Sequence, residues 1–246
     1  GQGKSTICES GDAAHNGDFA DKLEAFRAYG ISGAFREALA NYEEPFAEGH
    51  GLWLARYTDN HDEGRGLHRF GAGAVRAVNQ LIFLSSHCIP FLLTGQEFGA
   101  LNRPSIHERM GICDKGPRVV GDAGNVETFP GVEFEGNLFA RDRDARMMWY
   151  RFYQTLIHLR CHSPELTYGA FAHMDVGEDC PPEGRTVVAF ERRIAGSVVY
   201  CAINLGPEPR RLTTPEHFLA SPLYGKLVDD TLEPFGAIVV RVVERK

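Results

Sequence analysis

The sequence predicts an α/β domain with a parallel sheet, followed by a small antiparallel β domain. Two observations lead to this fold class. Between residues 51 and 94, two apolar runs of strand length flank an amphipathic helical segment, which is the pattern of a βαβ unit. After residue 170, β-branched runs alternate with Gly and Pro turns, and no helical period appears. With 246 residues, the chain is long enough to form a core without disulfide or metal cross-links.

The βαβ unit begins with a short apolar and aromatic run. Residues 51–58 (GLWLARYT) are long enough for one buried strand, and the polar cluster that starts at Asp59 ends it. Over residues 70–86, apolar side chains recur at intervals of three and four, which predicts a helix with one buried face. A second strand is predicted at 89–94 (IPFLLT), and the continuous apolar character of IPFLL suits a strand that is buried on both faces.

Another helix is predicted near the end of the α/β part. Residues 100–142 contain many Gly, Pro, Asp and Asn and show little periodicity, so we expect a long excursion or loop there. Residues 143–161 then carry apolar side chains, such as Trp149 and Leu156, on one helical face. Ser163 ends this helix, because the residue before a proline avoids helical backbone angles.

The C-terminal β domain is predicted from three β-branched runs. Residues 186–192 and 197–205 are joined by the short sequence RIAG and form a hairpin, and 237–243 supplies a further strand. We therefore expect two domains, with bounds 1–166 and 167–246.

The first fifty residues carry less distinct patterns. Residues 5–10 (STICES) are compatible with a short strand, and 22–30 (KLEAFRAYG) with either a helix or a short strand. Residues 32–44 are expected to be helical, since Ser32 is a good N-cap and apolar side chains follow at helical spacing.

Composition excludes several classes of protein. The net charge of −7 argues against a nucleic-acid partner, because an acidic surface repels phosphates and no Lys/Arg-rich run offsets this. No stretch approaches the roughly 20 apolar residues of a membrane span, so no membrane partner is expected. The six cysteines lie far apart without a CxxC pair, and no HExxH pattern occurs, so neither a disulfide framework nor a metal site is predicted. The sequence leaves the localisation open. Cysteines without an evident disulfide pattern favour the cytoplasm, where disulfides are rare.

The polar cluster after residues 51–58 is the strongest candidate for a functional site. The sequence YTDNHDEGR places three carboxylates, an amide, an imidazole and an arginine directly after a buried strand. In parallel α/β folds, the loops that follow the carboxyl ends of strands line the active site. A carboxylate there can stabilise a developing cation, and a histidine can hydrogen-bond a substrate hydroxyl. The alternative is a solvated loop in which Asp59 or Asn60 caps a turn.

The order of four segments resembles the α-amylase family of glycoside hydrolases. These segments are RYTDNHDEGR, IPFLLTGQEFG, FYQTLIHLRCHSPELTYGAF and AFERR followed by SVVYCAINL. They are similar to the family's NHD motif after strand seven, its GQE segment at strand eight, its last barrel helix and its C-terminal β-sandwich. The resemblance covers about residues 51–243. It implies an incomplete (β/α)8 barrel, made of the last four βα units, followed by a small antiparallel β-sandwich.

The resemblance also implies roles for residues of the polar cluster. Asp62 becomes the carboxylate that stabilises the transition state, and His61 the neighbouring hydroxyl-binding imidazole. Asn60 and Arg65 match the motif's amide and the arginine that often follows its aspartate, so both are expected to bind substrate. In the GQE segment, Gln96 and Glu97 correspond to positions whose family role is mostly architectural.

A retaining glycosidase needs two further carboxyl groups, a nucleophile and an acid/base about 5 Å from it. ICESGD resembles the end of the family's fifth strand, which makes Glu9 the candidate acid/base. The Arg-x-Asp motif of the nucleophile has no match before Glu9. The isolated chain is therefore expected to be inactive towards oligo- or polysaccharides with α-glucosidic linkages. No cofactor is expected, and no calcium, which the family usually holds in loops of the other half.

A non-catalytic carbohydrate-binding or assembly module that reuses the fold is the alternative function. Half a barrel leaves open strand edges and uncovered apolar surface, which favours association. The expected partner is then either a second copy of the chain or a complementing N-terminal half-barrel.

Overall fold

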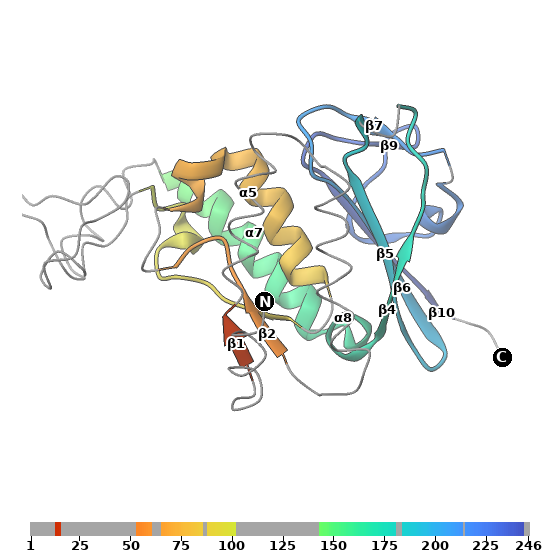
Figure 1. Cartoon of the computed structure of the whole chain (residues 1–246), viewed down its shortest axis with the longest axis horizontal. Coiled ribbons are helices and arrows are strands. Elements are labelled where there is room, and N and C mark those ends of the chain that lie inside the picture. Colours follow the sequence, from red (N-terminus) through yellow and green to blue (C-terminus); the bar gives the residue numbers. More distant parts are fainter. Residues whose placement is uncertain are drawn as a thin grey trace, which may run out of the picture.

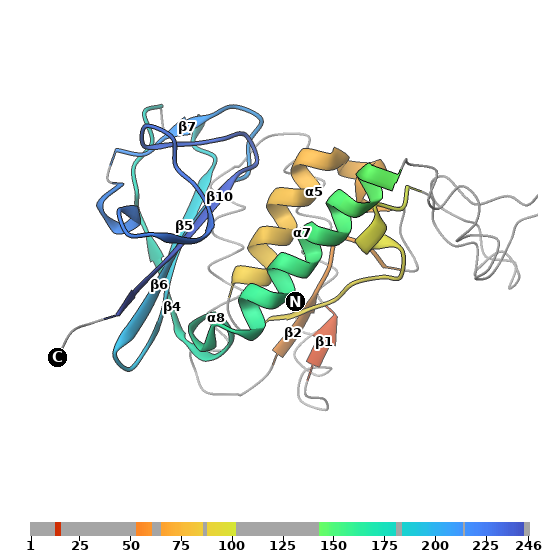
Figure 2. The same ribbon diagram turned by 180° about the vertical axis from the view of Figure 1, so that it is seen from behind.

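The computed structural model describes residues 13–15, 53–60, 65–85, 88–101, 143–180, 184–213 and 215–243. In this part of the chain, two long helices lie between a small parallel sheet and a larger antiparallel sheet (Figures 1 and 2). The expected mixture of parallel α/β structure followed by antiparallel β structure is thus present.

The parallel sheet has the strand order β1-β2-β3. The strands are β1 (Ala13–His15), β2 (Trp53–Arg56) and β3 (Cys88–Pro90). Strands β2 and β3 confirm the two predicted strands of the βαβ unit, although both are shorter than the apolar runs that contain them. The described neighbour of β2 on its other side is β1, with Ala14 opposite Leu54.

Helix α5 (Gly66–Leu84) connects β2 to β3, as predicted, but begins earlier than residue 70. Its first turn is separated from the rest by a kink at Gly71, where φ is +78°. Only the part after the kink carries the predicted apolar face. At Gly73 a Cβ atom would overlap the ring of Phe235, so the missing side chain lets the helix approach the C-terminal sheet closely.

Helix α7 (Arg143–Cys161) has the predicted bounds. Its buried stripe includes Trp149, Tyr153 and Leu156, because apolar residues at spacings of three and four share one helical face. A one-turn helix, α8 (Pro164–Tyr168), follows at once, and its proline occupies the first turn, where no amide hydrogen is needed.

The antiparallel sheet has the order β4-β5-β6-β10-β8. Its strands are β4 (Ala170–Met174), β5 (Val187–Ile194), β6 (Ser197–Asn204), β8 (Pro222–Gly225) and β10 (Ala237–Val243). Strands β5 and β6 confirm the predicted hairpin, which turns at Ala195 and Gly196. A two-stranded sheet of β7 (Arg210–Arg211) and β9 (Thr231–Leu232) and a 3-10 helix, η5 (Pro215–Phe218), complete this part.

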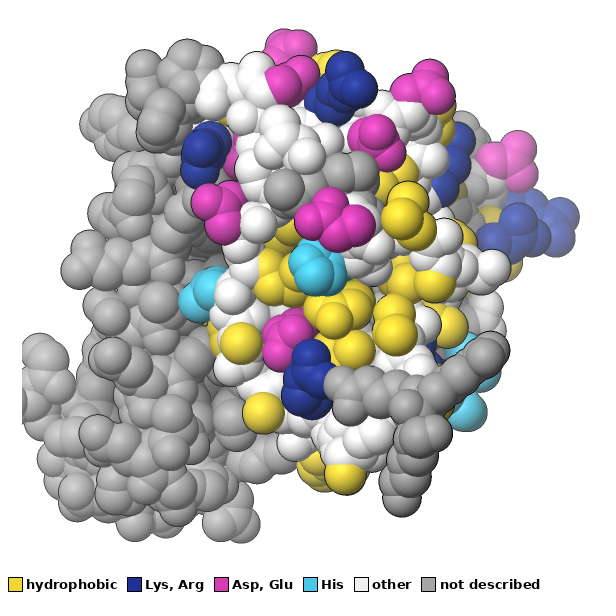
Figure 3. Space-filling view, turned by 90° about the vertical axis from the view of Figure 1, so that its right-hand side faces the viewer, with side chains coloured by type: hydrophobic (Ala, Val, Ile, Leu, Met, Phe, Trp, Pro, Cys, Tyr) yellow, Lys and Arg dark blue, Asp and Glu magenta, His cyan; other side chains and the backbone are white. Residues whose placement is uncertain are grey.

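Both faces of the antiparallel sheet are packed. One face, with Phe190 and Val239, joins α5 and α7 in a single apolar cluster. The other face, with Ala202 and Ile238, packs on Leu232 and its neighbours. Seen from the side of this sheet, apolar side chains gather among acidic and basic ones (Figure 3). The partial barrel, the β-sandwich and the boundary at residue 166 stay predictions.

Other expectations fall elsewhere in the chain. The predicted strand at 5–10, the helix at 32–44 and the segment 22–30 lie outside the described residues, as does the excursion from residue 102 to 142. Among the described helices, none combines the length and apolar character needed to cross a lipid bilayer.

Candidate functional site

The carboxyl ends of β2 and β3 meet at one edge of the parallel sheet. There Thr58 and Asp59 follow β2, and the 3-10 helix η1 (Gln96–Phe98) follows β3. Gly95 and Gly99 flank η1 with φ of +92° and +75°, a left-handed conformation that glycine adopts without strain. These two turns bring the GQEFG segment back towards the end of β2.

Gln96 connects the elements at this edge. Its side chain is buried, and its Nε2 donates hydrogen bonds to Thr58 Oγ1 and Tyr153 Oη, both at 2.9 Å. Its Oε1 accepts a hydrogen bond from the Leu93 amide at 3.2 Å. Asn79 of α5 joins the same cluster, since its Nδ2 lies 3.3 Å from Thr58 Oγ1. One amide side chain thus ties β2, the β3 loop, α5 and α7 together.

Asp59 and Arg65 fasten the two ends of the segment 60–64. Asp59 Oδ1 accepts a hydrogen bond from the Gly66 amide at 2.8 Å, and its Oδ2 lies 3.5 Å from Arg65 Nη1. Arg65 Nη2 in turn donates to the Thr94 carbonyl at 2.8 Å. The two residues that flank the segment 60–64 are therefore buried, and they are bound to each other and, through Arg65, to the loop after β3.

Burial dominates the electrostatics of this cluster. Desolvation raises the pKa of the Asp59 carboxyl, although the charge of Arg65 and the hydrogen bond from Gly66 lower it in part. Desolvation also holds the pKa of the Tyr153 hydroxyl well above its usual value, and the charge of Asp59 adds to the effect. Asp59 and Tyr153 are buried and hydrogen-bonded, so they suit a role in positioning neighbouring residues better than a role in proton transfer to solvent.

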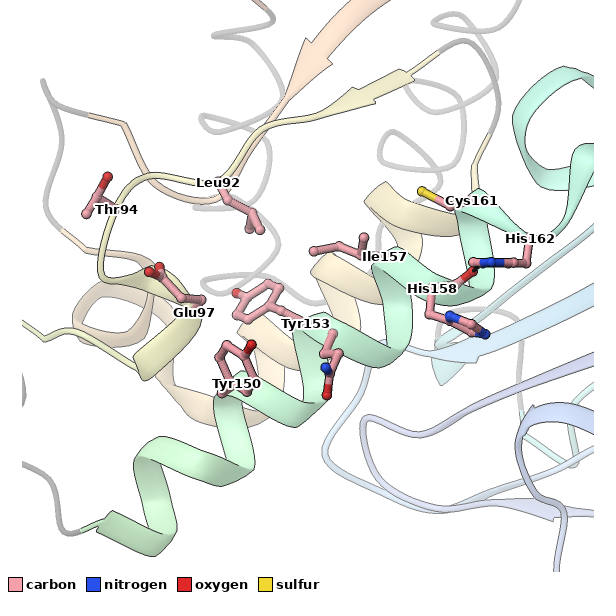
Figure 4. Close-up of a pocket in the computed structure, with 10 residues that line it drawn as sticks. Leu92, Thr94, Glu97, Tyr150, Tyr153, Ile157, His158, Cys161 and His162 are labelled. Carbon is pink, nitrogen blue, oxygen red and sulfur yellow. Dashed lines mark hydrogen bonds between the residues drawn. The ribbon is translucent and has the colours of Figure 1, made fainter.

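An open hollow of about 600 Å³ lies beside the cluster (Figure 4). Thr94 and Glu97 form one side of it, and Tyr150, Tyr153 and other residues of α7 the opposite side. The Phe98 ring stacks on that of Tyr150, with centroids 5.6 Å apart. Among the described residues, no group of three or more His, Cys, Asp or Glu could hold a metal ion.

Comparison with solved structures decides the fold. An α-amylase from H. orenii matches 95% of this chain at a TM-score of 0.63 and 19% identity. The chain has the fold of the α-amylase family. A trehalose-6-phosphate hydrolase from Bacillus licheniformis matches 85% of the chain, at a TM-score of 0.57 and 17% identity. An isomaltulose synthase from Klebsiella sp. LX3 matches 83%, at 0.56 and 19%. No protein-family model and no curated protein matches the chain.

The resemblance to the C-terminal region of α-amylase-family proteins is thereby confirmed at the level of the fold. The matched part amounts to 49% of the H. orenii chain, 46% of the hydrolase and 45% of the synthase. The chain thus spans about half the length of these solved structures.

Within this α-amylase fold, two of the five predicted site residues can be placed. Asn60 is half-buried directly after Asp59, and Arg65 is buried with its guanidinium facing Asp59 and the Thr94 carbonyl. Both belong to the same edge of the sheet. Burial of Arg65 favours an anchoring function, and its predicted contact with substrate stays a prediction. The other three, Glu9, His61 and Asp62, lie outside the described residues.

Some residues of the cluster were not predicted as part of the site. Thr58 was assigned only to the end of a strand and Tyr153 only to a helix with one apolar face, whereas Asp59 was counted in the polar cluster without a role of its own. The hydroxyl group of Tyr153, within an otherwise apolar stripe, could have indicated a polar contact, because a buried tyrosine usually finds a hydrogen-bond partner. Its partner Gln96 is 57 residues away in the sequence.

Proposed function

We propose that the chain is the C-terminal part of an α-amylase-family glycoside hydrolase or transglycosylase that acts on α-glucosidic linkages by a retaining mechanism. One observation carries the proposal. Asp59 and Arg65, which flank the NHD motif in the sequence, lie beyond β2 at the carboxyl edge of the parallel sheet, where they contact each other and Arg65 binds the loop after β3. In barrels of parallel strands, catalytic groups sit at this edge.

The proposed mechanism is a double displacement in which this chain supplies two of the three carboxyl groups. Glu9 protonates the glycosidic oxygen while an aspartate outside this chain attacks the anomeric carbon and forms a glycosyl ester. Asp62 stabilises the positive charge that develops on the sugar ring, and His61 and Asn60 bind its hydroxyls. Glu9 then removes a proton from water or from an acceptor sugar, which attacks the ester and restores the nucleophile.

The names of the matched solved structures support a substrate class. The solved structures with this fold include an α-amylase, a trehalose-6-phosphate hydrolase and an isomaltulose synthase. We propose an oligo- or polysaccharide with α-glucosidic linkages as the ligand of this chain. The anchored arrangement of Arg65 supports a role in holding the Asp62 loop in place for that ligand.

Sugar binding by the purified chain tests the proposal. Titration calorimetry should detect maltotetraose with a dissociation constant on the order of millimolar, because only part of the site is present. Asp62→Asn and His61→Ala should abolish this heat, and the β-linked cellotetraose should give none. Turnover of a nitrophenyl α-glucoside should be absent, since no nucleophile forms the ester.

Two results would contradict the proposal. Turnover that is lost in Asp62→Asn would show that the chain is an enzyme by itself. Binding of maltotetraose with the same affinity in the wild type, in Asp62→Asn and in His61→Ala would instead indicate a non-catalytic carbohydrate-binding module.

A further inference from the structure

Phe235 adopts a backbone conformation that is unusual for a bulky side chain. Its φ is +56°, in the left-handed region. The other described non-glycine residues with positive φ are Asp229 and Asp230, and aspartate enters this region more readily than an aromatic residue does. A bulky residue keeps such a conformation only where its surroundings hold it there, and residues of this kind gather at functional sites.

Hydrogen bonds on two sides fix the turn that carries Phe235. Residues 233–236 form this turn, in which the last amide donates a hydrogen bond to the first carbonyl at 2.9 Å. Proline is its second residue and Phe235 its third, a position with positive φ that glycine usually fills. The buried side chain of Asn204 donates to the first carbonyl of the turn at 3.1 Å, and the Phe235 amide donates to the Gly206 carbonyl at 3.1 Å. The aromatic ring is therefore held in a defined position.

The Phe235 ring lies against the start of α5. It packs on the apolar cluster that α5 and α7 share with the antiparallel sheet. At Gly73 it occupies the space that a Cβ atom would need. Gly73 is two residues beyond the kink at Gly71, so the ring contacts α5 where the regular part of the helix begins.

The other end of the kinked turn contacts the candidate site. At Gly66 a Cβ atom would lie 2.6 Å from Asp59 Oδ1, and the Gly66 amide donates its hydrogen bond to the same oxygen. The segment from Gly66 to Gly73 is thus packed closely at both ends, on the site at one end and on Phe235 at the other. A single helical turn is not stable by itself, so the position of the turn before the kink depends on these contacts.

We propose that Phe235 positions the buried pair of Asp59 and Arg65 by supporting the kinked start of α5. Without the ring, a gap opens beside Gly73, the turn that carries the Gly66 amide moves more freely, and its hydrogen bond to Asp59 opens more often. An effect of Phe235 on sugar binding rests on the proposed function, whereas its effect on Asp59 and Arg65 does not.

Hydrogen exchange of single amides, measured by NMR on the purified chain, tests the proposal. In Phe235→Ala, the Gly66 amide should exchange at least about fivefold faster than in the wild type, because its local opening no longer breaks the contact with the ring. Phe235 is half-buried, so this variant should fold. The amide of the fully buried Leu84, at the other end of α5, reports on global unfolding.

Tyr200→Ala is the matched control. Tyr200 is also a half-buried aromatic residue of the antiparallel sheet, but it packs on the cluster at the other face. Its loss should speed exchange at Leu84 through lower global stability and leave the rate at Gly66 unchanged, because local opening of the α5 start does not break its contacts.

Gly73→Ala tests the contact itself. Alanine favours a helix more than glycine does, so the substitution should slow exchange of the Gly66 amide wherever the space beside residue 73 is free. In the wild type the ring fills this space, and exchange should become at least about fivefold faster. In the Phe235→Ala background the same substitution should slow exchange about two- to fivefold.

Titration with maltotetraose adds a readout at the proposed sugar site. Phe235→Ala should raise the dissociation constant of the wild type at least about threefold, and Tyr200→Ala should leave it unchanged. A wild type that binds no sugar refutes the proposed function, and the exchange rates then decide the role of Phe235 alone.

Four results would overturn the proposal. They are an unchanged rate at Gly66 in Phe235→Ala, an equal rise of that rate in Tyr200→Ala, the same effect of Gly73→Ala in both backgrounds, and an unchanged affinity of Phe235→Ala for a sugar that the wild type binds.

Discussion

Replacing Gln96 by leucine should destabilise the protein more than any other single change at the edge of the parallel sheet. Leucine is similar in size but makes none of the hydrogen bonds to Thr58, Tyr153 and Leu93. Thr58 retains the contact with Asn79, whereas the Tyr153 hydroxyl and the Leu93 amide lose the bonds described above. An unsatisfied buried group costs about 1 to 3 kcal/mol, so the loss of both bonds should lower the free energy of unfolding by about 2 to 6 kcal/mol.

A double-mutant cycle isolates the contribution of one hydrogen bond. Tyr153→Phe removes only the hydroxyl, and the free energies of unfolding of Gln96→Leu, Tyr153→Phe and the double variant can be measured in urea by circular dichroism. The coupling between the two positions should be about 1 kcal/mol, the net value of a buried hydrogen bond. Gln154→Leu, the same substitution at an exposed position, should change the stability by less than about 0.5 kcal/mol. Equal effects of Gln96→Leu and Gln154→Leu, or a coupling near zero, would refute this account of the cluster.

Two further predictions concern stability. Burial raises the pKa of the Asp59 carboxyl in the folded state above its value in the unfolded state. The stabilisation that this carboxyl contributes is therefore complete at a pH below the unfolded-state pKa, and it is lost as the pH rises through the folded-state pKa. The stability of the wild type relative to Asp59→Asn should therefore fall as the pH rises above about 4 in urea titrations, and an increase would contradict the sign. Gly225 and Gly196 both have positive φ, but only at Gly225 would a Cβ overlap a backbone oxygen, that of Ala237. Gly225→Ala should cost at least about 3 kcal/mol and Gly196→Ala about 1 kcal/mol in thermal or urea unfolding, and equal costs would rule out the steric cause.

Elements with a strong local pattern were predicted well. The apolar stripe of residues 143–161 predicted α7 with the bounds that the structure has, because helical periodicity depends only on residues within a few turns. The hairpin of β5 and β6 was likewise encoded in two β-branched runs and a short turn. Strands β7 and β9 were not predicted, because each has two residues and exists only through pairing with a strand about twenty residues away.

The extent of β3 shows another limit of the sequence pattern. The run 89–93 is apolar throughout, yet β3 covers Cys88–Pro90 and the chain then leaves the sheet. Leu92 instead lines the hollow beside α7, and Leu93 donates its amide to Gln96. Ile89 is 41% exposed and Phe91 40%, so the prediction that this segment is buried on both faces is wrong. Apolar character predicted a strand here, but burial depends on which elements pack against its two faces.

For the candidate site, the sequence by itself determined which chemical groups follow the first strand of the βαβ unit: a carboxylate, an imidazole and an amide. The order of the segments around Asp62, His61 and Asn60 led to the glycoside hydrolase hypothesis, and it did so without any knowledge of side-chain contacts. Those residue types are informative because they sit directly after a buried strand, where parallel folds bind their ligands.

Only the tertiary structure decided how that loop is held. Gln96 is 38 residues from Thr58 and 57 from Tyr153, so no pattern within a window of the sequence could connect them. The same holds for Arg65, whose sequence context suggested a substrate ligand, whereas packing turns its guanidinium towards Asp59 and the Thr94 carbonyl. Buried polar groups must find partners, but folding of the whole chain determines which partners come within reach.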